Sequence, residues 1–461
     1  LIQYRTSGKA RKYNHCKCYG QQPDGTWVLK NKQFKKDGTP TTEEETGWVY
    51  NPNLGFEDKI PCPELAEQDP YALTKLVNAA RPFFGQENFH QLMLLMGWTV
   101  AGLQFQEIFS SEGSFPLFNA FGPPGALKTI AAETCLSLIG TNWSEHGILS
   151  SASVSALYEH LSKVSSLPLV WDDPKRIKDN DELVKQLYNC KSRKVRGNEQ
   201  TPKSPLAITS NHALAAEQEA AFTRLIRALF EVKINGSPKY YQSLREAMKT
   251  ASGAFSSLIN IGYPIEEIQA TEFEFLQYLP LAHARIAKSL AIVTWYAQHI
   301  LSMTGGSENI KQWVIDNICP SENDEDNNGD SLEDFIKKLL ALEAESIVGD
   351  WNLKRGIERD GKKFVAIYAQ NCWKLVDQKF LPATYNQKSL KPLVFKAGGN
   401  IRTTVRFNSD RDQTLAYKRA LITAPENCKP SLPETKPRTA WLIPSELFEK
   451  FDKDACNHPE E

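Results

Sequence analysis

The stretch Phe118-Asn-Ala-Phe-Gly122-Pro-Pro-Gly125-Ala-Leu-Lys128-Thr129, followed by the run IAAETCLSLIG, decides the fold of this chain. It begins as a short apolar strand, turns through a loop of glycine and proline, and continues as an apolar helix. Backbone N–H groups of such a loop, together with the positive end of the helix dipole, form a site for phosphate groups. The sequence therefore predicts a strand–loop–helix unit that binds the phosphate chain of a nucleotide.

The spacing is that of the P-loop pattern G-x-x-x-x-G-K-[ST], except that Leu127 stands where glycine is usual. A Cβ at that position crowds the loop or disfavours a positive φ. In this interpretation Lys128 reaches the β and γ oxygens of ATP, and the Thr129 hydroxyl takes a coordination position on Mg²⁺. The alternative is a plain helix start with Lys128 in solvent. The expected nucleotide-binding residues are Gly122, Pro123, Pro124, Gly125, Ala126, Leu127, Lys128, Thr129 and Ile130.

A pair of acids follows the apolar run Leu167-Pro-Leu-Val-Trp171, namely Asp172 and Asp173 before Pro174. A strand that ends in two carboxylates near a P-loop supplies what nucleotide hydrolysis needs. Asp172 is expected to hold Mg²⁺, and Asp173 to orient or deprotonate the attacking water. In isolation the same residues are also typical of a turn.

Three later segments continue the pattern. The run Ile208-Thr-Ser-Asn211 predicts a strand whose terminal Asn211 senses the γ-phosphate. In Phe222-Thr-Arg224-Leu-Ile-Arg227, Arg224 is a candidate arginine finger for the γ-phosphate of a neighbouring subunit. Between the acids and this strand lies a basic segment that predicts a hairpin gripping a nucleic-acid backbone, or alternatively a solvated turn. Its contact residues are Arg193, Lys194 and Arg196.

The order GPPGALKT, LPLVWDD, KSRKVRG, AITSN and FTRLIR, within residues 115–235, resembles the AAA+ ATPases of the superfamily 3 and minichromosome-maintenance-like helicase group. The resemblance implies ATP and Mg²⁺ as cofactors, with Thr129 and Asp172 at the metal. It implies catalytic roles for Asp173, Asn211 and Arg224, a pore hairpin, and a homo-oligomeric ring, plausibly a hexamer. The chain departs from the group at Leu127, where alanine occurs, and at Asp173, where glutamate is common.

Composition sets outer limits on the function. The 461 residues are 41% hydrophobic and 24% charged, and 54 Lys and Arg balance 55 Asp and Glu. This excludes a largely disordered chain and a globally basic nucleic-acid binder. Nine scattered cysteines and a polar start favour an intracellular protein, in the cytoplasm, or the nucleus of a eukaryotic host. Every apolar stretch is shorter than the ~20 residues of a membrane span, so no membrane partner is expected.

The predicted fold class is α/β: a three-layer AAA+ P-loop core with a parallel sheet, helical regions on either side, and a small C-terminal winged-helix-like domain. Strands are expected at 117–121, 167–171, 206–209 and 228–234, and helices at 129–139, 153–163 and 181–190. The expected regions are 1–68 (small and β-rich), 69–114 (helical), 115–235 (ATPase core), 236–320 (helical lid), 321–350 (acidic linker), 351–424 (basic winged-helix-like domain) and 425–461 (tail).

The C-terminal charge pattern is uneven. Residues 321–350 hold ten acids and two lysines, whereas residues 351–424 hold fifteen Lys and Arg and five acids. Helices at 369–379 and 386–396, followed by strand-like runs at 401–407 and 416–423, give a winged-helix order that resembles the DNA-binding tails of such helicases. A protein-binding winged helix is the alternative. The expected phosphate contacts are Lys388, Lys391, Arg402 and Arg406.

Together these features predict an ATP-dependent DNA helicase or translocase that works as a ring, with a role in the replication of a mobile element, plasmid or virus. Its partner is single-stranded or forked DNA, with RNA left open. Two alternatives stay open: a nucleic-acid-binding scaffold that binds nucleotide without hydrolysing it, and an AAA+ regulatory ATPase that unwinds nothing.

Overall fold

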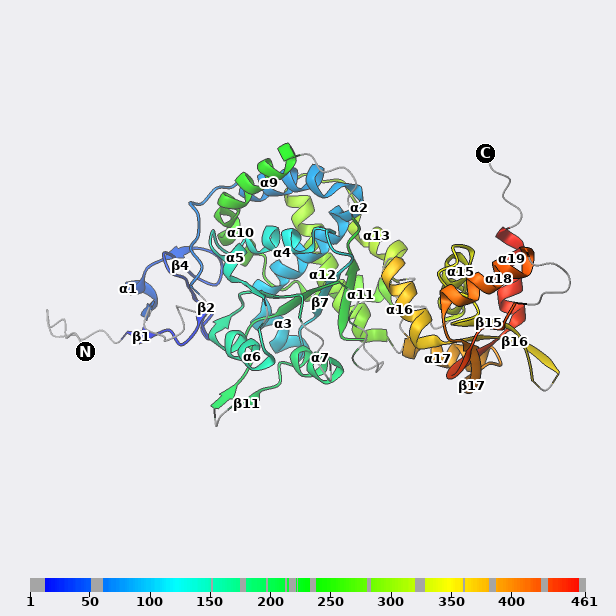
Figure 1. Ribbon diagram of the computed structural model, residues 1–461. Coiled ribbons are helices and arrows are strands. Elements are labelled where there is room, and N and C mark those ends of the chain that lie inside the picture. Colours follow the sequence, from blue (N-terminus) through cyan, green and yellow to red (C-terminus); the bar gives the residue numbers. More distant parts are fainter. Residues whose placement is uncertain are drawn as a thin grey trace, which may run out of the picture. The chain divides into compact units, whose positions relative to one another are not determined.

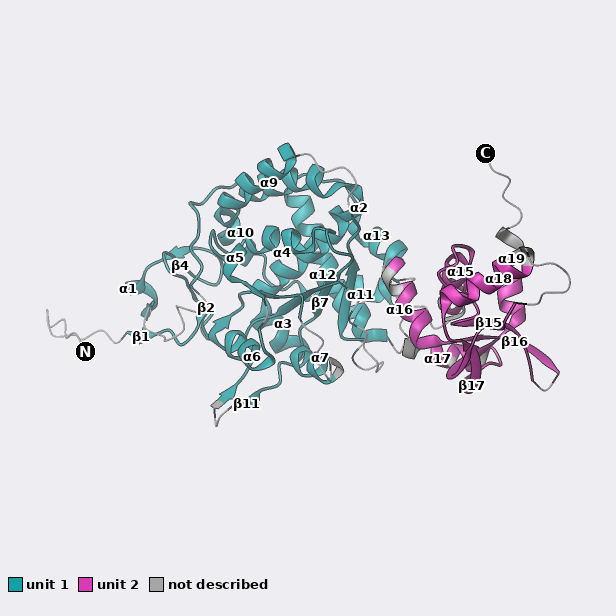
Figure 2. Ribbon diagram, in the orientation of Figure 1, with its two compact units in different colours: residues 1–323 teal, residues 324–461 magenta. Residues whose placement is uncertain are grey.

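The chain forms two compact units, residues 1–323 and 324–461, each with its own hydrophobic core (Figures 1 and 2). The computed structural model describes residues 13–50, 61–150, 152–174, 180–195, 198–211, 214, 221, 223–232, 238–279, 283–319, 328–359, 361–380, 387–423 and 430–455.

A five-stranded parallel sheet forms the centre of the first unit, in the order β14-β7-β13-β10-β8. Every residue of β7 and β13 is buried, so both faces of the sheet are covered. The prediction of a parallel α/β sheet is confirmed. The last strand begins three residues earlier than expected, because Arg227 interrupts its apolar run. The strands are β7 (Leu117–Phe121), β8 (Ile148–Ser150), β10 (Leu169–Asp172), β13 (Leu206–Ser210) and β14 (Leu225–Leu229).

Helices surround this sheet. The three helices predicted within the core are found, and the residues before it, 69–114, contain one long buried helix and one short helix. The long helix, α2, packs against α4, α9 and α12, and is interrupted at Gly85, whose φ is 69°. The helices up to the end of the core are α2 (Ala72–Leu103), α3 (Phe105–Glu112), α4 (Lys128–Leu136), α5 (Trp143–His146), α6 (Val154–Lys163) and α7 (Asn180–Tyr188).

The described residues after the sheet, up to Asn317, are mainly helical. The first of these helices is tied to α4 by an ion pair in which Arg245 Nη1 lies 2.8 Å from Glu133 Oε2. The P-loop helix and this helical region therefore form one packed body. The helices are α9 (Pro238–Thr250), the 3₁₀ helix η1 (Ala251–Ala254), α10 (Phe255–Ile259), α11 (Ile265–Phe275), α12 (Ala284–Met303) and α13 (Ile310–Asn317).

The described N-terminal residues form short strands, and these strands join the core. Strand β2 pairs in parallel with β9, which immediately precedes the strand carrying the acids. The Ser166 hydroxyl, which follows β9, donates to Gln21 Oε1 at 2.9 Å in a buried site. The elements are β1 (Asn14–His15), β2 (Tyr19–Gln21), β3 (Trp27–Val28), β4 (Gln33–Phe34), β5 (Pro40–Thr41), α1 (Glu43–Thr46), β6 (Trp48–Val49) and β9 (Val164–Ser165).

The second unit contains a four-stranded antiparallel sheet in the order β15-β16-β18-β17, so the winged-helix arrangement is not confirmed. Of the two runs expected as a hairpin, the first is β17, but the second lies in helix α18. The elements are α15 (Asn328–Ala344), β15 (Leu353–Arg359), β16 (Lys362–Ile367), α16 (Ala369–Lys379), α17 (Gln387–Lys396), β17 (Asn400–Asn408), α18 (Arg411–Thr423), β18 (Thr435–Pro444) and α19 (Ser445–Ala455).

Two expectations about this unit are wrong. The acidic linker is helix α15 over Asn328–Ala344, because its Leu332, Phe335 and Leu339 recur at helical spacing and are buried in the core. The C-terminal tail supplies strand β18, which lies between β16 and β17, with Ala440–Ile443 buried. The many prolines around that segment disfavour a strand in the sequence pattern. The strand is stabilised by its pairing with β16 and β17.

Within the described residues, no single helix has the length and apolar composition to cross a membrane. Helices α2 and α3 meet that requirement only jointly, and the chain bends by 82° between them.

Candidate nucleotide-binding site

The predicted nucleotide residues meet at the carboxyl edge of the parallel sheet. Strand β13 lies between β7 and β10, so the loop after β13 sits between the P-loop and the acids. Ligands of α/β sheets bind at this edge, where neighbouring connections run in opposite directions. A cavity of about 350 Å³ opens here. Its lining is Pro124, Gly125, Ala126, Leu127, Lys128, Thr129, Ile130, Asp172, Asp173, Thr209, Ser210 and Asn211.

Leu127 takes the left-handed backbone conformation that glycine would adopt without strain at this position of the loop. Gly122 lies so close to β14 that a Cβ there would be 2.1 Å from the Phe230 carbonyl oxygen. Leu127 immediately precedes α4 and takes the left-handed conformation, with φ 64° and ψ 12°. A residue with a Cβ adopts that region at a cost of about 1–2 kcal/mol. The chain thus accepts local strain to hold the first N–H groups of α4 toward the cavity.

Lys128 is turned inward onto its own loop. Its Nζ donates to the carbonyl oxygens of Gly122 at 2.7 Å and Pro123 at 2.9 Å, and to Asn211 Oδ1 at 3.3 Å. Burial lowers the pKa of Lys128, and the carboxylates of Asp173 and Asp172 partly oppose that shift. The ammonium group of Lys128 therefore lies beside the cavity, close to Asp172 and Asp173, the two acids expected to act with it.

The magnesium pair predicted from the sequence is in contact. Thr129 Oγ1 donates to Asp172 Oδ1 at 3.3 Å, and Thr209 Oγ1 donates to the same oxygen. Hydroxyl and carboxylate oxygens are the ligands that Mg²⁺ prefers, so this donor set fits that ion. Asp173 is exposed and lies farther out, with Asn211 Nδ2 3.5 Å from its Oδ1. The structure thus brings together both acids, the hydroxyl and the strand-end amide.

One positioning residue was missed. Asn119, in the middle of β7, is fully buried and joins the P-loop strand to β13. Its Nδ2 donates to Ile208 O at 3.1 Å and Ser210 Oγ at 2.9 Å, and its Oδ1 accepts from Leu214 N at 3.0 Å. The signal in the sequence was an amide inside an otherwise apolar strand, where a buried polar group needs partners.

Arg224 does not join this cavity. It precedes β14, whose first residue Leu225 pairs with Leu117 at the start of β7, whereas the P-loop follows the end of β7. Arg224 therefore lies at the opposite edge of the sheet. Its guanidinium carbon is 5.5 Å from the centroid of the Tyr188 ring. Burial lowers the pKa of Arg224, and the charge of Arg285, at the start of α12, lowers it further.

The predicted basic hairpin is present. Strands β11 (Arg193–Val195) and β12 (Asn198–Gln200) pair antiparallel, and the hairpin extends away from the body of the unit (Figure 1). Arg193 and Lys194 are exposed, while Arg196 lies outside the described residues. The charged groups that can be placed are thus accessible to a partner.

The predicted basic residues of the second unit occupy two elements. Lys391 is half-buried on α17, and the side chain of Lys388 lies outside the described part of the structure. Arg402 and Arg406 are exposed on β17, where they alternate with buried Val405 and Phe407. These two arginines therefore lie on one face of an edge strand, and not on the wing of a winged helix.

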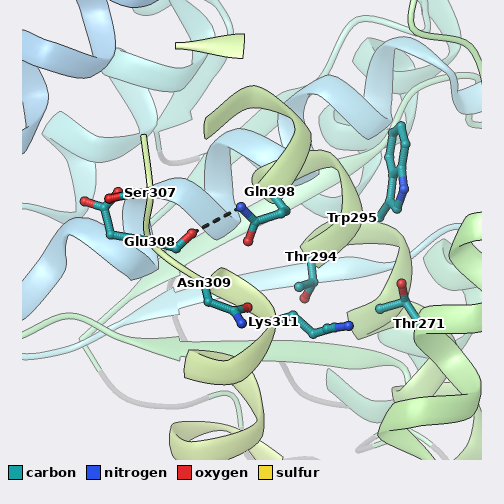
Figure 3. Close-up of a pocket in the computed structure, with 8 residues that line it drawn as sticks. All are labelled: Thr271, Thr294, Trp295, Gln298, Ser307, Glu308, Asn309 and Lys311. Atoms are coloured by element: carbon teal, nitrogen blue, oxygen red, sulfur yellow. Dashed lines mark hydrogen bonds between the residues drawn. The ribbon is translucent and has the colours of Figure 1, made fainter. Parts of the chain in front are cut away.

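A second cavity, of about 440 Å³, lies among α11, α12 and the start of α13 (Figure 3). Two of its polar side chains already have partners: Gln298 Nε2 donates to Glu308 O at 3.1 Å, and Lys311 forms an ion pair at 2.6 Å with Glu274, which does not line the cavity. None of the residues predicted for nucleotide or nucleic acid lines it.

Comparisons with known proteins do not identify a family for this chain. No protein-family model matches the chain, and neither does any curated protein. A solved structure titled "SCCmec type IV Cch – active helicase" is 14% identical with a TM-score of 0.48, covering 92% of this chain and 78% of that one. The apo structure of the NrS-1 C terminal region is 13% identical with a TM-score of 0.27, covering 67% and 80%. At these values the function must be argued from the residues themselves.

Proposed function

We propose that this protein is a P-loop ATPase of the AAA+ superfamily 3 and minichromosome-maintenance-like type, which uses ATP hydrolysis to move along or unwind DNA. The observation that carries the proposal is the meeting of Lys128, Thr129, Asp172, Asp173 and Asn211 around one cavity. Three separate sequence segments predicted these roles, and the proposal gives each residue a place in one reaction.

The geometry supports a division of roles. Lys128 would exchange the carbonyl oxygens of its own loop for the β- and γ-phosphates, with the N–H groups at the start of α4 beside it. Thr129 and Asp172 would hold Mg²⁺, which neutralises phosphate charge when bound. Asp173 would orient the attacking water or take its proton. Asn211, already in contact with both Lys128 and Asp173, would align them on the γ-phosphate.

Oligomerisation belongs to the proposal because Arg224 cannot reach the nucleotide of its own chain. A ring, plausibly a hexamer, would bring the amino edge of one sheet to the carboxyl edge of the next. The guanidinium groups of Arg224 and the nearby Arg285 would then face a neighbour's γ-phosphate.

Nucleic acid completes the proposed reaction. The exposed hairpin with Arg193 and Lys194, and Arg402 and Arg406 of the second unit, would contact phosphates of single-stranded or forked DNA. RNA is the alternative substrate, and its effect on ATP turnover is to be compared with that of DNA. We also propose that the protein acts inside the cell, in the cytoplasm or a eukaryotic nucleus, in the replication of a mobile element, plasmid or virus.

The decisive experiment measures ATP turnover with and without single-stranded DNA, for the wild type and for Lys128→Ala. We expect DNA to stimulate turnover, and Lys128→Ala to abolish it. Lys249→Ala, on the exposed surface of α9, is the matched control and should turn over normally. If turnover does not depend on Lys128, the proposal of an ATPase is wrong. If DNA does not stimulate turnover, the proposal of a DNA translocase or helicase is wrong.

A second candidate function rests on the strained Leu127 and on the short reach of Asp173. Here the protein binds MgATP without hydrolysing it and serves as a nucleic-acid-binding scaffold. Tight Lys128-dependent nucleotide binding with no turnover would select this candidate. Turnover without strand displacement would instead select an AAA+ regulatory ATPase.

A further inference from the structure

Two neighbouring strands of the second unit form an unusually cationic ribbon. Strands β17 and β18 pair antiparallel from Asn400–Asn408 to Thr435–Leu442. Neither strand contains an acid, and together they contain four cations. Two of these, Arg402 and Arg406, are already part of the proposed nucleic-acid surface. The other two, Lys436 and Arg438, come from the segment that looked like a tail in the sequence.

Arg438 lies over an aromatic ring. Its guanidinium carbon lies 4.6 Å from the centroid of the Tyr368 ring, which follows β16. The side chain is half-buried, and its Nε is shielded from solvent with no hydrogen-bond partner among the described residues. The guanidinium is therefore partly withdrawn from water beside the ring, where a cation–π contact is stronger than at a fully exposed site.

Lys436 lies on the same face of the sheet as Arg438, because side chains two residues apart in a strand point to the same side. The two positions are therefore separated by about 7 Å along β18. Their direct partners on β17, Phe407 and Val405, belong to a small buried apolar cluster. Lys436 itself is exposed. A planar cation and a mobile cation thus stand side by side at the margin of an apolar patch.

We infer that Tyr368, Arg438 and Lys436 form a binding site for single-stranded nucleic acid. A base stacks on the face of the Arg438 guanidinium turned away from Tyr368, and Lys436 contacts a phosphate of the same strand. Bases of a single strand are free to stack on aromatic rings and guanidinium planes, whereas those of a duplex are already stacked on each other. The inference rests on the proposed function in one respect, namely that the ligand of this surface is a nucleic acid.

The test uses the full-length protein and labelled oligonucleotides of about 20 nucleotides, long enough for a typical single-strand site. Arg438→Lys keeps the charge and removes the plane, so we expect single-strand affinity to fall about fivefold or more, with its salt dependence unchanged. Lys436→Ala should lower the slope of log K against log salt by about 0.7. Lys418→Ala, which removes a cation already 2.9 Å from Asp350, is the matched control and should change neither quantity.

Wild-type affinity in Arg438→Lys would overturn the stacking site. An equal loss for duplex DNA would also overturn it, since it would indicate contact with phosphates alone. Oligo-dT and oligo-U arms then assign the strand as DNA or RNA. ATP turnover without nucleic acid, measured on the same variants, should match the wild type. If the wild type and Lys128→Ala turn over ATP equally, the proposed ATPase function is wrong. The affinities of the Arg438 and Lys436 variants for oligonucleotides would still test the binding site independently.

Discussion

Leu127 departs from the P-loop motif in its side chain, but its backbone keeps the conformation that the motif requires. The P-loop needs a left-handed residue before Lys128, and Leu127 supplies it at φ 64°. Its side chain packs against the core, so burial of apolar surface offsets part of the backbone strain. The loop geometry is therefore set by the surrounding packing as much as by the residue.

This account predicts opposite effects for two substitutions. Leu127→Val places a β-branched residue in the left-handed region, which should destabilise the loop by about 1 kcal/mol or more and weaken MgATP binding. Leu127→Gly relieves the strain but gives up packing, so it should bind MgATP at least as well as the wild type. Calorimetric titration with MgATP checks both. Equal binding by the valine variant would show that the loop is not strained in solution.

Lys128 also gives a prediction about pH. Burial lowers the pKa of Lys128, and the phosphates bind its protonated form. The dissociation constant for MgATP should therefore rise about tenfold per pH unit above that lowered pKa, and this rise should begin at a lower pH than for an ordinary lysine. The unfolded chain holds the proton more tightly, so the free energy of unfolding should rise with pH between the two pKa values. Lys128→Met should lose the pH dependence of binding.

At the scale of elements, the pair between Glu133 on α4 and Arg245 on α9 joins the P-loop helix to the helical region. Burial raises the pKa of Glu133, and Arg245 opposes the shift. Arg245→Ala leaves this carboxylate without its cation. The side chains are 25% and 42% exposed, so we expect the free energy of unfolding to fall by about 1 kcal/mol.

Urea denaturation at neutral pH checks that value. Glu133→Gln combined with Arg245→Ala should recover part of the loss, because the amide carries no charge to bury. If the double variant is less stable than Arg245→Ala alone, the ion pair is not what joins these two helices.

At the scale of the whole molecule, the location of Arg224 predicts complementation between subunits. Lys128→Ala should be inactive because it lacks the cation that contacts the phosphates, and Arg224→Ala should lose at least about 100-fold in turnover while still binding MgATP. Mixed before assembly, the two variants should recover turnover, since an intact Arg224 can face an intact P-loop across an interface. Turnover of mixtures and mass photometry check this. If the ATP turnover of the mixture is only the sum of the two inactive variants, Arg224 does not act on the nucleotide of a neighbouring subunit.

Much of the first unit could be predicted from local sequence. The strand–loop–helix at Lys128, the acids after β10 and the hairpin at Arg193 each depend on residues close together in the chain. The second unit was predicted less well, because its sheet is assembled from distant segments. Twenty-six residues, which include a helix, separate the end of β17 from the start of β18, and no local pattern identifies such a partner.

The sequence by itself determined the chemistry and order of the site: a lysine and threonine opening a helix, two carboxylates closing a strand, and an amide closing the next. Periodicity and turn residues act over a few positions, and they were sufficient for this. Only the tertiary structure decided the neighbours. It placed β13 between β7 and β10, Arg224 at the opposite edge, and Arg438 over Tyr368. Strand order and stacking arise from burying apolar faces shared by segments far apart in the chain, and no single stretch encodes that packing.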